Sequence, residues 1–114
     1  LGETLGCGVI ITDLDSIIAV SKLPKKDYKE KSISNDLEQL IENRESKTFK
    51  DSKLVQLHKD DSMEYTHQII TPIVSSSGDC IGSVVLVSKE AEMLSEFDEK
   101  ILKIAANFLG KQVQ

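Results

Sequence analysis

The chain has 114 residues, of which 39% are hydrophobic and 29% charged, and its formal net charge is −5. These values describe one globular domain with a single core. A surface that grips nucleic acid needs an excess of Lys and Arg, so the acidic balance argues against direct DNA binding by this chain.

The first predicted elements are two short strands. Residues 7–12 and 17–20 are apolar runs separated by the turn residues Asp13, Asp15 and Ser16, which is the pattern of a β-hairpin. Residues 21–31 follow with one proline and five lysines, and predict a loop or a short irregular helix. The lysines could meet an anionic ligand, although a solvated loop explains them more simply.

A helix is predicted over residues 34–44. Ser34 is a good N-cap, and Leu37, Leu40 and Ile41 fall on one face at helical spacing. Because this apolar stripe is short, we expect the helix to lie over one edge of a sheet.

Two strands should follow this helix. Residues 48–57 carry scattered aliphatic side chains and predict a strand, and strand character resumes at residues 65–70. Pro72 then interrupts the run, and a proline in a sheet indicates an edge strand or a bulge.

The clearest hairpin signal lies in the second half of the chain. Residues 69–74 and 80–87 are rich in β-branched side chains and flank a turn of Ser, Gly and Asp at residues 75–79. The second run is apolar at both even and odd positions, which predicts a central strand covered on both faces.

The last predicted helix begins near Ser95. Its apolar band is wider than one sheet face needs, so we expect one side on the sheet and another against a second helix. The complete order of strand, strand, helix, three strands and helix predicts an α+β domain with an antiparallel sheet. The residues that we assign to oligomerisation are Leu94, Phe97, Ile101, Ile104, Ala105 and Phe108.

The second hairpin resembles that of GAF domains, which are relatives of PAS domains. The residues that carry this resemblance are Pro72-Ile73-Val74, Gly78, Ile81-Gly82 and Val84-Val85-Leu86. The resemblance implies a GAF/PAS-like central antiparallel sheet with helices on both faces. It also implies a ligand pocket between the sheet and the middle helix.

The first half is similar to the C-terminal domains of the stage V sporulation protein T family. That similarity lies in Ala19-Val20-Ser21, Lys25-Lys26-Asp27-Tyr28 and Lys31-Ser32-Ile33-Ser34. It implies the effector domain of a transcription regulator of sporulation, located in the forespore cytoplasm. Residues 1–114 are then a single GAF-like domain, cut from a longer protein, with a truncated N-terminal helix and its DNA-binding domain elsewhere.

Four polar residues could orient a small molecule in the implied pocket: Tyr28, Ser32, Ser34 and Thr66. Alternatively, Ser34 only caps its helix and Tyr28 only covers the core. Two functions therefore stay open. One is a sensor of an unidentified small-molecule effector, and the other is a dimerisation or interaction module that binds no ligand. The expected partners are that effector and further copies of the chain, but neither nucleic acid nor a membrane.

No catalytic, cofactor or metal motif is present in the sequence. Cys7 and Cys80 each begin a strand, and antiparallel pairing would separate them by about 20 Å, too far for a disulfide. For this reason we do not expect the thiol chemistry by which some GAF proteins reduce methionine sulfoxide. His58 and His67 match no standard metal-ligand spacing. We therefore expect no enzyme, no cofactor and no metal site.

Overall fold

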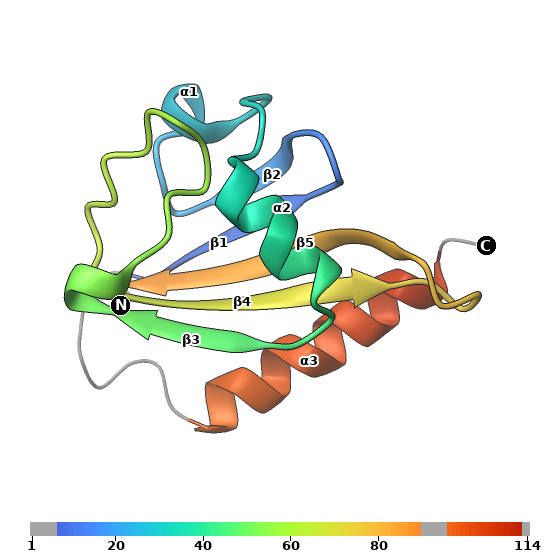
Figure 1. The fold of residues 1–114 in the computed structure, drawn as a ribbon. Coiled ribbons are helices and arrows are strands. Elements are labelled where there is room, and N and C mark those ends of the chain that lie inside the picture. Colours follow the sequence, from blue (N-terminus) through green and yellow to red (C-terminus); the bar gives the residue numbers. More distant parts are fainter. Residues whose placement is uncertain (1–6, 90–95, 113–114) are drawn as a thin grey trace.

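The structure is a computed structural model that describes residues 7–89 and 96–112. Its centre is a five-stranded antiparallel sheet in the order β2-β1-β5-β4-β3 (Figure 1). This sheet and its helices confirm the predicted α+β class. The strands are β1 (Cys7–Thr12), β2 (Ile17–Ser21), β3 (Lys47–Lys50), β4 (His67–Val74) and β5 (Cys80–Ser88).

Helices cover both faces of the sheet. The long helix α3 (Glu96–Lys111) runs along one face, and α1 (Lys25–Tyr28) and α2 (Asn35–Glu42) lie over the other (Figure 1). A single 3-10 turn, η1 (Asp51–Lys53), follows β3. The segment of residues 54–66 then returns across the sheet face that α1 and α2 occupy, before the chain enters β4.

The central strand is β5, which pairs with β1 on one side and with β4 on the other. Its side chains alternate between two hydrophobic clusters: Val85 and Val87 face α1 and α2, whereas Val84 and Leu86 face α3. β5 therefore contributes side chains to both clusters. This confirms the prediction that residues 80–87 form a central strand covered on both faces, since neighbouring residues of a strand point to opposite faces.

The position of α2 differs from the expectation. The helix lies over the central strands β4 and β5 rather than over an edge, and Leu37 and Ile41 are fully buried. Ile70 and Val85 of the sheet belong to the same buried cluster as these two helix residues. A short apolar stripe therefore indicated the length of the helix and not its place on the sheet.

The predicted strand over residues 48–57 is also shorter than expected. β3 ends at Lys50, and residues 54–57 form a loop. The Gln68 side chain takes the place of a strand neighbour there, because its Oε1 accepts from Val55 N–H at 2.6 Å and its Nε2 donates to the Val55 carbonyl at 3.0 Å. The buried Gln68 amide thus supplies the hydrogen-bond partners that a neighbouring strand would give to the backbone of Val55.

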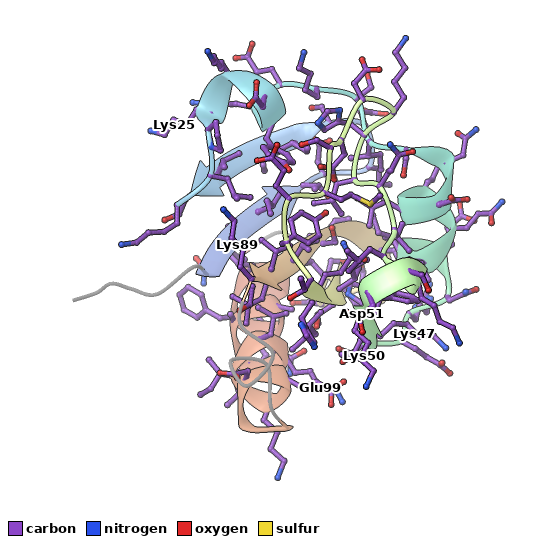
Figure 2. The ribbon with its side chains drawn as sticks, turned by 90° about the vertical axis from the view of Figure 1, so that its left-hand side faces the viewer. Lys25, Lys47, Lys50, Asp51, Lys89 and Glu99 are labelled. Carbon is purple, nitrogen blue, oxygen red and sulfur yellow. The ribbon has the colours of Figure 1, made fainter. Side chains whose placement is uncertain are left out.

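Pro72 lies in β4, an interior strand, where it pairs with Ser83 of β5. On the other side of β4 the pairing with β3 stops at Ile70, so Pro72 faces no strand there and loses no hydrogen bond. The prediction of an edge strand is therefore wrong for β4 as a whole, although the strand has no neighbour on one side at Pro72. At the true edge, Lys47 and Lys50 of β3 are exposed beside Asp51 (Figure 2), and such charges discourage pairing with another sheet.

Candidate functional site

A groove of about 670 Å³ opens at the N-terminal end of α2. Its size falls within the range of small-molecule sites. The connection between α1 and α2 forms one wall, and residues 56–60 form the other. The charged and polar residues that line it include Lys31, Ser32, Ser34, Asp36, His58, Lys59 and Asp60.

Ser34 joins the two walls of this groove. As the N-cap of α2, its Oγ accepts from Leu37 N–H at 3.1 Å. The same hydroxyl donates to the Gln56 carbonyl at 2.6 Å, and the Ser34 N–H donates to the Leu57 carbonyl at 2.9 Å. The structure therefore gives Ser34 the capping role that the sequence left open, and its hydroxyl proton is already committed.

His58 is almost completely buried at the groove, with 4% of its surface exposed. Its Nδ1 accepts from Asp60 N–H at 3.2 Å, and its ring meets the Tyr28 ring edge-on with centroids 5.3 Å apart. Since Nδ1 accepts this hydrogen bond, the neutral form of the ring carries its hydrogen on Nε2. Among the described residues that Nε2 has no hydrogen-bond partner. A buried donor without an acceptor is costly.

A buried carboxylate holds the wall that contains His58. Asp61 Oδ1 accepts from the Tyr28 hydroxyl at 2.7 Å and from Met63 N–H at 2.9 Å. Its Oδ2 accepts from Leu57 N–H at 3.0 Å and from the Tyr65 hydroxyl at 2.9 Å. Each carboxylate oxygen thus takes two hydrogen bonds, so Asp61 ties residues 57–65 to α1.

Both tyrosine hydroxyls of this network resist ionisation. Burial and then the hydrogen bond to Asp61 raise the pKa of Tyr28 above its ordinary value, and burial and then the Asp61 charge raise that of Tyr65. The two side chains therefore stay neutral and donate to the carboxylate across the physiological range.

Asp61 was not among the predicted site residues. It stands in a polar Asp-Asp-Ser stretch that is typical of a turn, and its partner Tyr28 lies 33 residues earlier in the chain. No local pattern joins the two residues. Its neighbours Asp60 and Ser62 are exposed and fit the polar turn that the sequence indicated.

The structure brings three of the four proposed ligand residues together. Ser32 and Ser34 line the groove, and Tyr28 lines two smaller cavities beside it, of about 200 and 250 Å³. Thr66 lies elsewhere, at the end of β5, where its N–H donates to the Ser88 carbonyl at 2.9 Å. Ser32 forms an isolated β-bridge with Ser16, near the Thr12 end of β1, whereas Thr66 lies near the Cys7 end. One small ligand would therefore not reach both Ser32 and Thr66.

The space between α2 and the sheet, where the resemblance placed a pocket, holds apolar side chains. Leu37 and Ile41 pack there against Ile10, Ile70 and Val85, and each of these five side chains is fully buried. The groove lies beyond this cluster, at the end of the helix rather than beneath it.

The outer face of α3 carries large exposed apolar side chains. Ile101, Ile104 and Phe108 are 49%, 64% and 63% exposed, while Leu102 and Ala106 are buried on the sheet. Of the remaining residues assigned to oligomerisation, Ala105 is half-buried. Leu94 and the Phe97 side chain lie outside the described residues. No helix within the described ranges is long and apolar enough to span a membrane.

The cysteines lie far apart in the sheet. Cys7 pairs with Ser88 at one end of β5, and Cys80 begins the same strand at the other end. This register agrees with the expected separation of the two residues. Across residues 7–89 and 96–112, no three His, Cys, Asp or Glu side chains gather as they would around a metal ion.

Comparisons with known proteins add a family and a fold. A family model described as stage V sporulation protein T C-terminal, transcription factor, matches residues 1–114. Stage V sporulation protein T of Bacillus subtilis (strain 168) is 41% identical over 114 residues, which cover all of this chain and 63% of that protein. The chain thus spans less than two thirds of this relative.

A solved structure of type II free methionine-R-sulfoxide reductase from Thermoplasma acidophilum has a similar fold. The TM-score is 0.70 with 15% identity, over 90% of this chain and 75% of the reductase chain. At this identity the likeness concerns the arrangement of helices and strands, and it is compatible with a GAF-like fold.

Proposed function

The chain belongs to the family of stage V sporulation protein T C-terminal domains, and from this premise we propose that it is a GAF-like effector domain of a sporulation transcription regulator. It would control a DNA-binding domain elsewhere in the same protein, in the cytoplasm of the forespore. The net charge of −5 supports the separation of these roles, because an acidic domain is poorly suited to hold DNA itself. The proposal assigns no reaction to this chain.

We further propose that the domain senses a small molecule in the groove at the start of α2. The observation that carries this proposal is the unpartnered Nε2 of His58, a buried donor in the wall of a groove of about 670 Å³. A bound molecule with an acceptor at this point would remove the cost of the unmade hydrogen bond.

Ligand binding at this place would also tie two segments together. The groove lies between the α1–α2 connection and residues 56–60, which Ser34 and Asp61 already link at other points. A molecule held by both walls would stiffen this end of the domain. That change would offer a route from ligand to regulator, since a ligand shifts an equilibrium by its different affinity for the two states.

A thermal-shift screen of metabolites tests the sensor proposal. A ligand that binds only the folded domain raises its melting temperature. The matched variants are Ser32→Tyr, which fills the groove from an exposed position, and Ser52→Tyr, which places the same side chain on η1, outside the groove. A compound that stabilises the natural chain and Ser52→Tyr, but not Ser32→Tyr, supports the proposal. If a chemically diverse library contains no stabilising compound, the sensor role is contradicted.

A second candidate function is an interaction module that pairs through α3. The observation that favours it is the exposed row of Ile101, Ile104 and Phe108, because large apolar side chains gathered on one helix face are typical of an interface. Sedimentation equilibrium measures this directly. A chain that stays monomeric at high concentration would contradict self-association through this face.

A further inference from the structure

The first turn of α2 presents two free backbone donors to the groove. Ser34 caps the N–H of Leu37 with its hydroxyl and that of Glu38 with its carbonyl. The N–H groups of Asn35 and Asp36 precede these, and neither has an acceptor among the described residues. Both residues line the groove. The start of a helix attracts negative charge, because its unpaired N–H groups and its dipole point the same way.

His58 adds a donor of independent origin. Its Nδ1 is fixed as an acceptor by the Asp60 N–H, so its Nε2 carries a hydrogen that no described residue accepts. The ring is held in place by the edge-on contact with Tyr28 and by burial. An oxygen atom in the groove is the partner that this geometry lacks.

Two lysines complete the set of donors. Lys31 and Lys59 line opposite walls of the groove, both are exposed, and neither has a carboxylate within ion-pair distance among the described residues. Asp36 and Asp60 also line the groove, so its formal charge is balanced. The backbone and imidazole donors then decide the preference, and they favour a small ligand with one acidic group over a highly charged one.

We infer that the ligand of this groove carries an oxyanion, a carboxylate or a phosphate, held by the α2 amides, His58 Nε2 and the two lysines. This inference rests on the proposed sensor function and names the class of its effector. Carboxylate and phosphate share the chemistry that these donors recognise, and the experiment separates them.

The test is a titration of the ¹⁵N-labelled chain, followed by NMR, with sodium phosphate and with sodium acetate. Sodium chloride of equal ionic strength and uncharged acetamide are the controls. The amide signals of Asn35 and Asp36 and the His58 Nε2 signal should shift with at least one anion and with neither control. The free chain should show His58 as the Nε2–H form. A larger effect of one anion identifies the source of the oxyanion.

Lysine variants give the second measurement. Lys31→Gln and Lys59→Gln should each weaken binding of the anion by about two- to fivefold, as expected for one exposed charge pair. Lys26→Gln makes the same charge change on α1, outside the groove, and should leave the affinity unchanged. All three lysines are exposed, so these variants keep the fold.

The outcomes separate this inference from the sensor proposal. If both anions act no differently from sodium chloride, the oxyanion assignment is wrong. It is also wrong if a screened compound is lost in Ser32→Tyr but binds Lys31→Gln and Lys59→Gln with full affinity, although the sensor role then stands. Only a library without any stabilising compound contradicts both.

Discussion

The Tyr28 hydroxyl donates a 2.7 Å hydrogen bond to Asp61 Oδ1, and this bond joins α1 to the segment of residues 54–66. Both residues are buried, and His58 packs against the tyrosine ring. The wall of the groove is therefore held by a polar contact inside an apolar cluster. A fully satisfied buried network of this kind fixes one arrangement of its neighbours.

Asp61→Asn should destabilise the domain by about 2–3 kcal/mol, the range for hydrogen bonds to a buried charged group. An asparagine keeps one acceptor oxygen but turns an NH₂ group toward two donors, either Leu57 N–H and Tyr65 or Met63 N–H and Tyr28. The measurement is urea unfolding. Asp60→Asn is the matched control, because this neighbour is exposed and should change the stability by less than about 0.5 kcal/mol. Equal effects of the two variants would show that the hydrogen bonds of Asp61 do not stabilise the domain.

The raised pKa values of Tyr28 and Tyr65 predict a loss of stability in alkali. In the unfolded chain tyrosine ionises near its ordinary value of about 10, whereas the folded domain keeps these protons to higher pH. The folded state therefore binds more protons above that value, and its stability falls as pH rises. Below it the contribution of the two tyrosines is fully present.

Tyr65→Phe isolates one of these groups. Its stability should be lower than that of the natural chain at pH 8, because a hydrogen bond to Asp61 is lost. Above pH 10, however, its stability should fall less steeply than that of the natural chain. The two slopes should differ by about 1.4 kcal/mol for each pH unit, which is the contribution of one proton. Urea unfolding between pH 8 and 11 measures both slopes. Parallel curves for the two chains would show that Tyr65 ionises normally in the folded domain.

Much of the fold could be predicted because its signals are local. The β4–β5 hairpin is marked by β-branched runs and by Gly78 in its turn, where φ is +92°. The α2 N-cap is marked by Ser34. The place of α2 over the central strands and the early end of β3 were not predicted, since both depend on partners far along the chain. Gln68, for example, replaces a strand neighbour for Val55 by a side-chain contact that no periodicity indicates.

The candidate site was predicted only in part, for the same reason. Ser32 and Ser34 line a groove at the start of α2 and not the predicted space beneath the helix, and their role as ligand residues stays a prediction. His58 was assigned to a polar loop, but it is buried, and its ring contacts Tyr28, thirty residues earlier in the chain. Thr66 was placed near the others by the family resemblance, but its backbone pairs with Ser88 at the far end of the sheet.

Gly110→Ala should destabilise the domain, although alanine favours helices over glycine by about 1 kcal/mol. A Cβ at Gly110 would collide with the backbone carbonyl of Val74 in β4. Overpacking of this kind costs about 1–3 kcal/mol, so after the helix preference of alanine the net loss should be up to about 2 kcal/mol. Asn107→Ala, on an exposed part of the same helix, is the control and should be neutral or slightly stabilising. A more stable Gly110→Ala domain would mean that the helix can move away from β4 freely.

Ile104→Lys tests the outer face of α3 as an interface. The side chain is 64% exposed, so the substitution should change the free energy of unfolding of the monomer by less than about 0.5 kcal/mol. In a self-associated domain, however, it would place two unpaired charges in a desolvated contact and weaken the dimer by tenfold or more. Sedimentation equilibrium of both chains measures this, and Lys103→Glu, beside it on the helix, controls for a change of charge alone. If Ile104→Lys and the natural chain associate equally, α3 does not pair through this row and the interaction-module proposal loses its support.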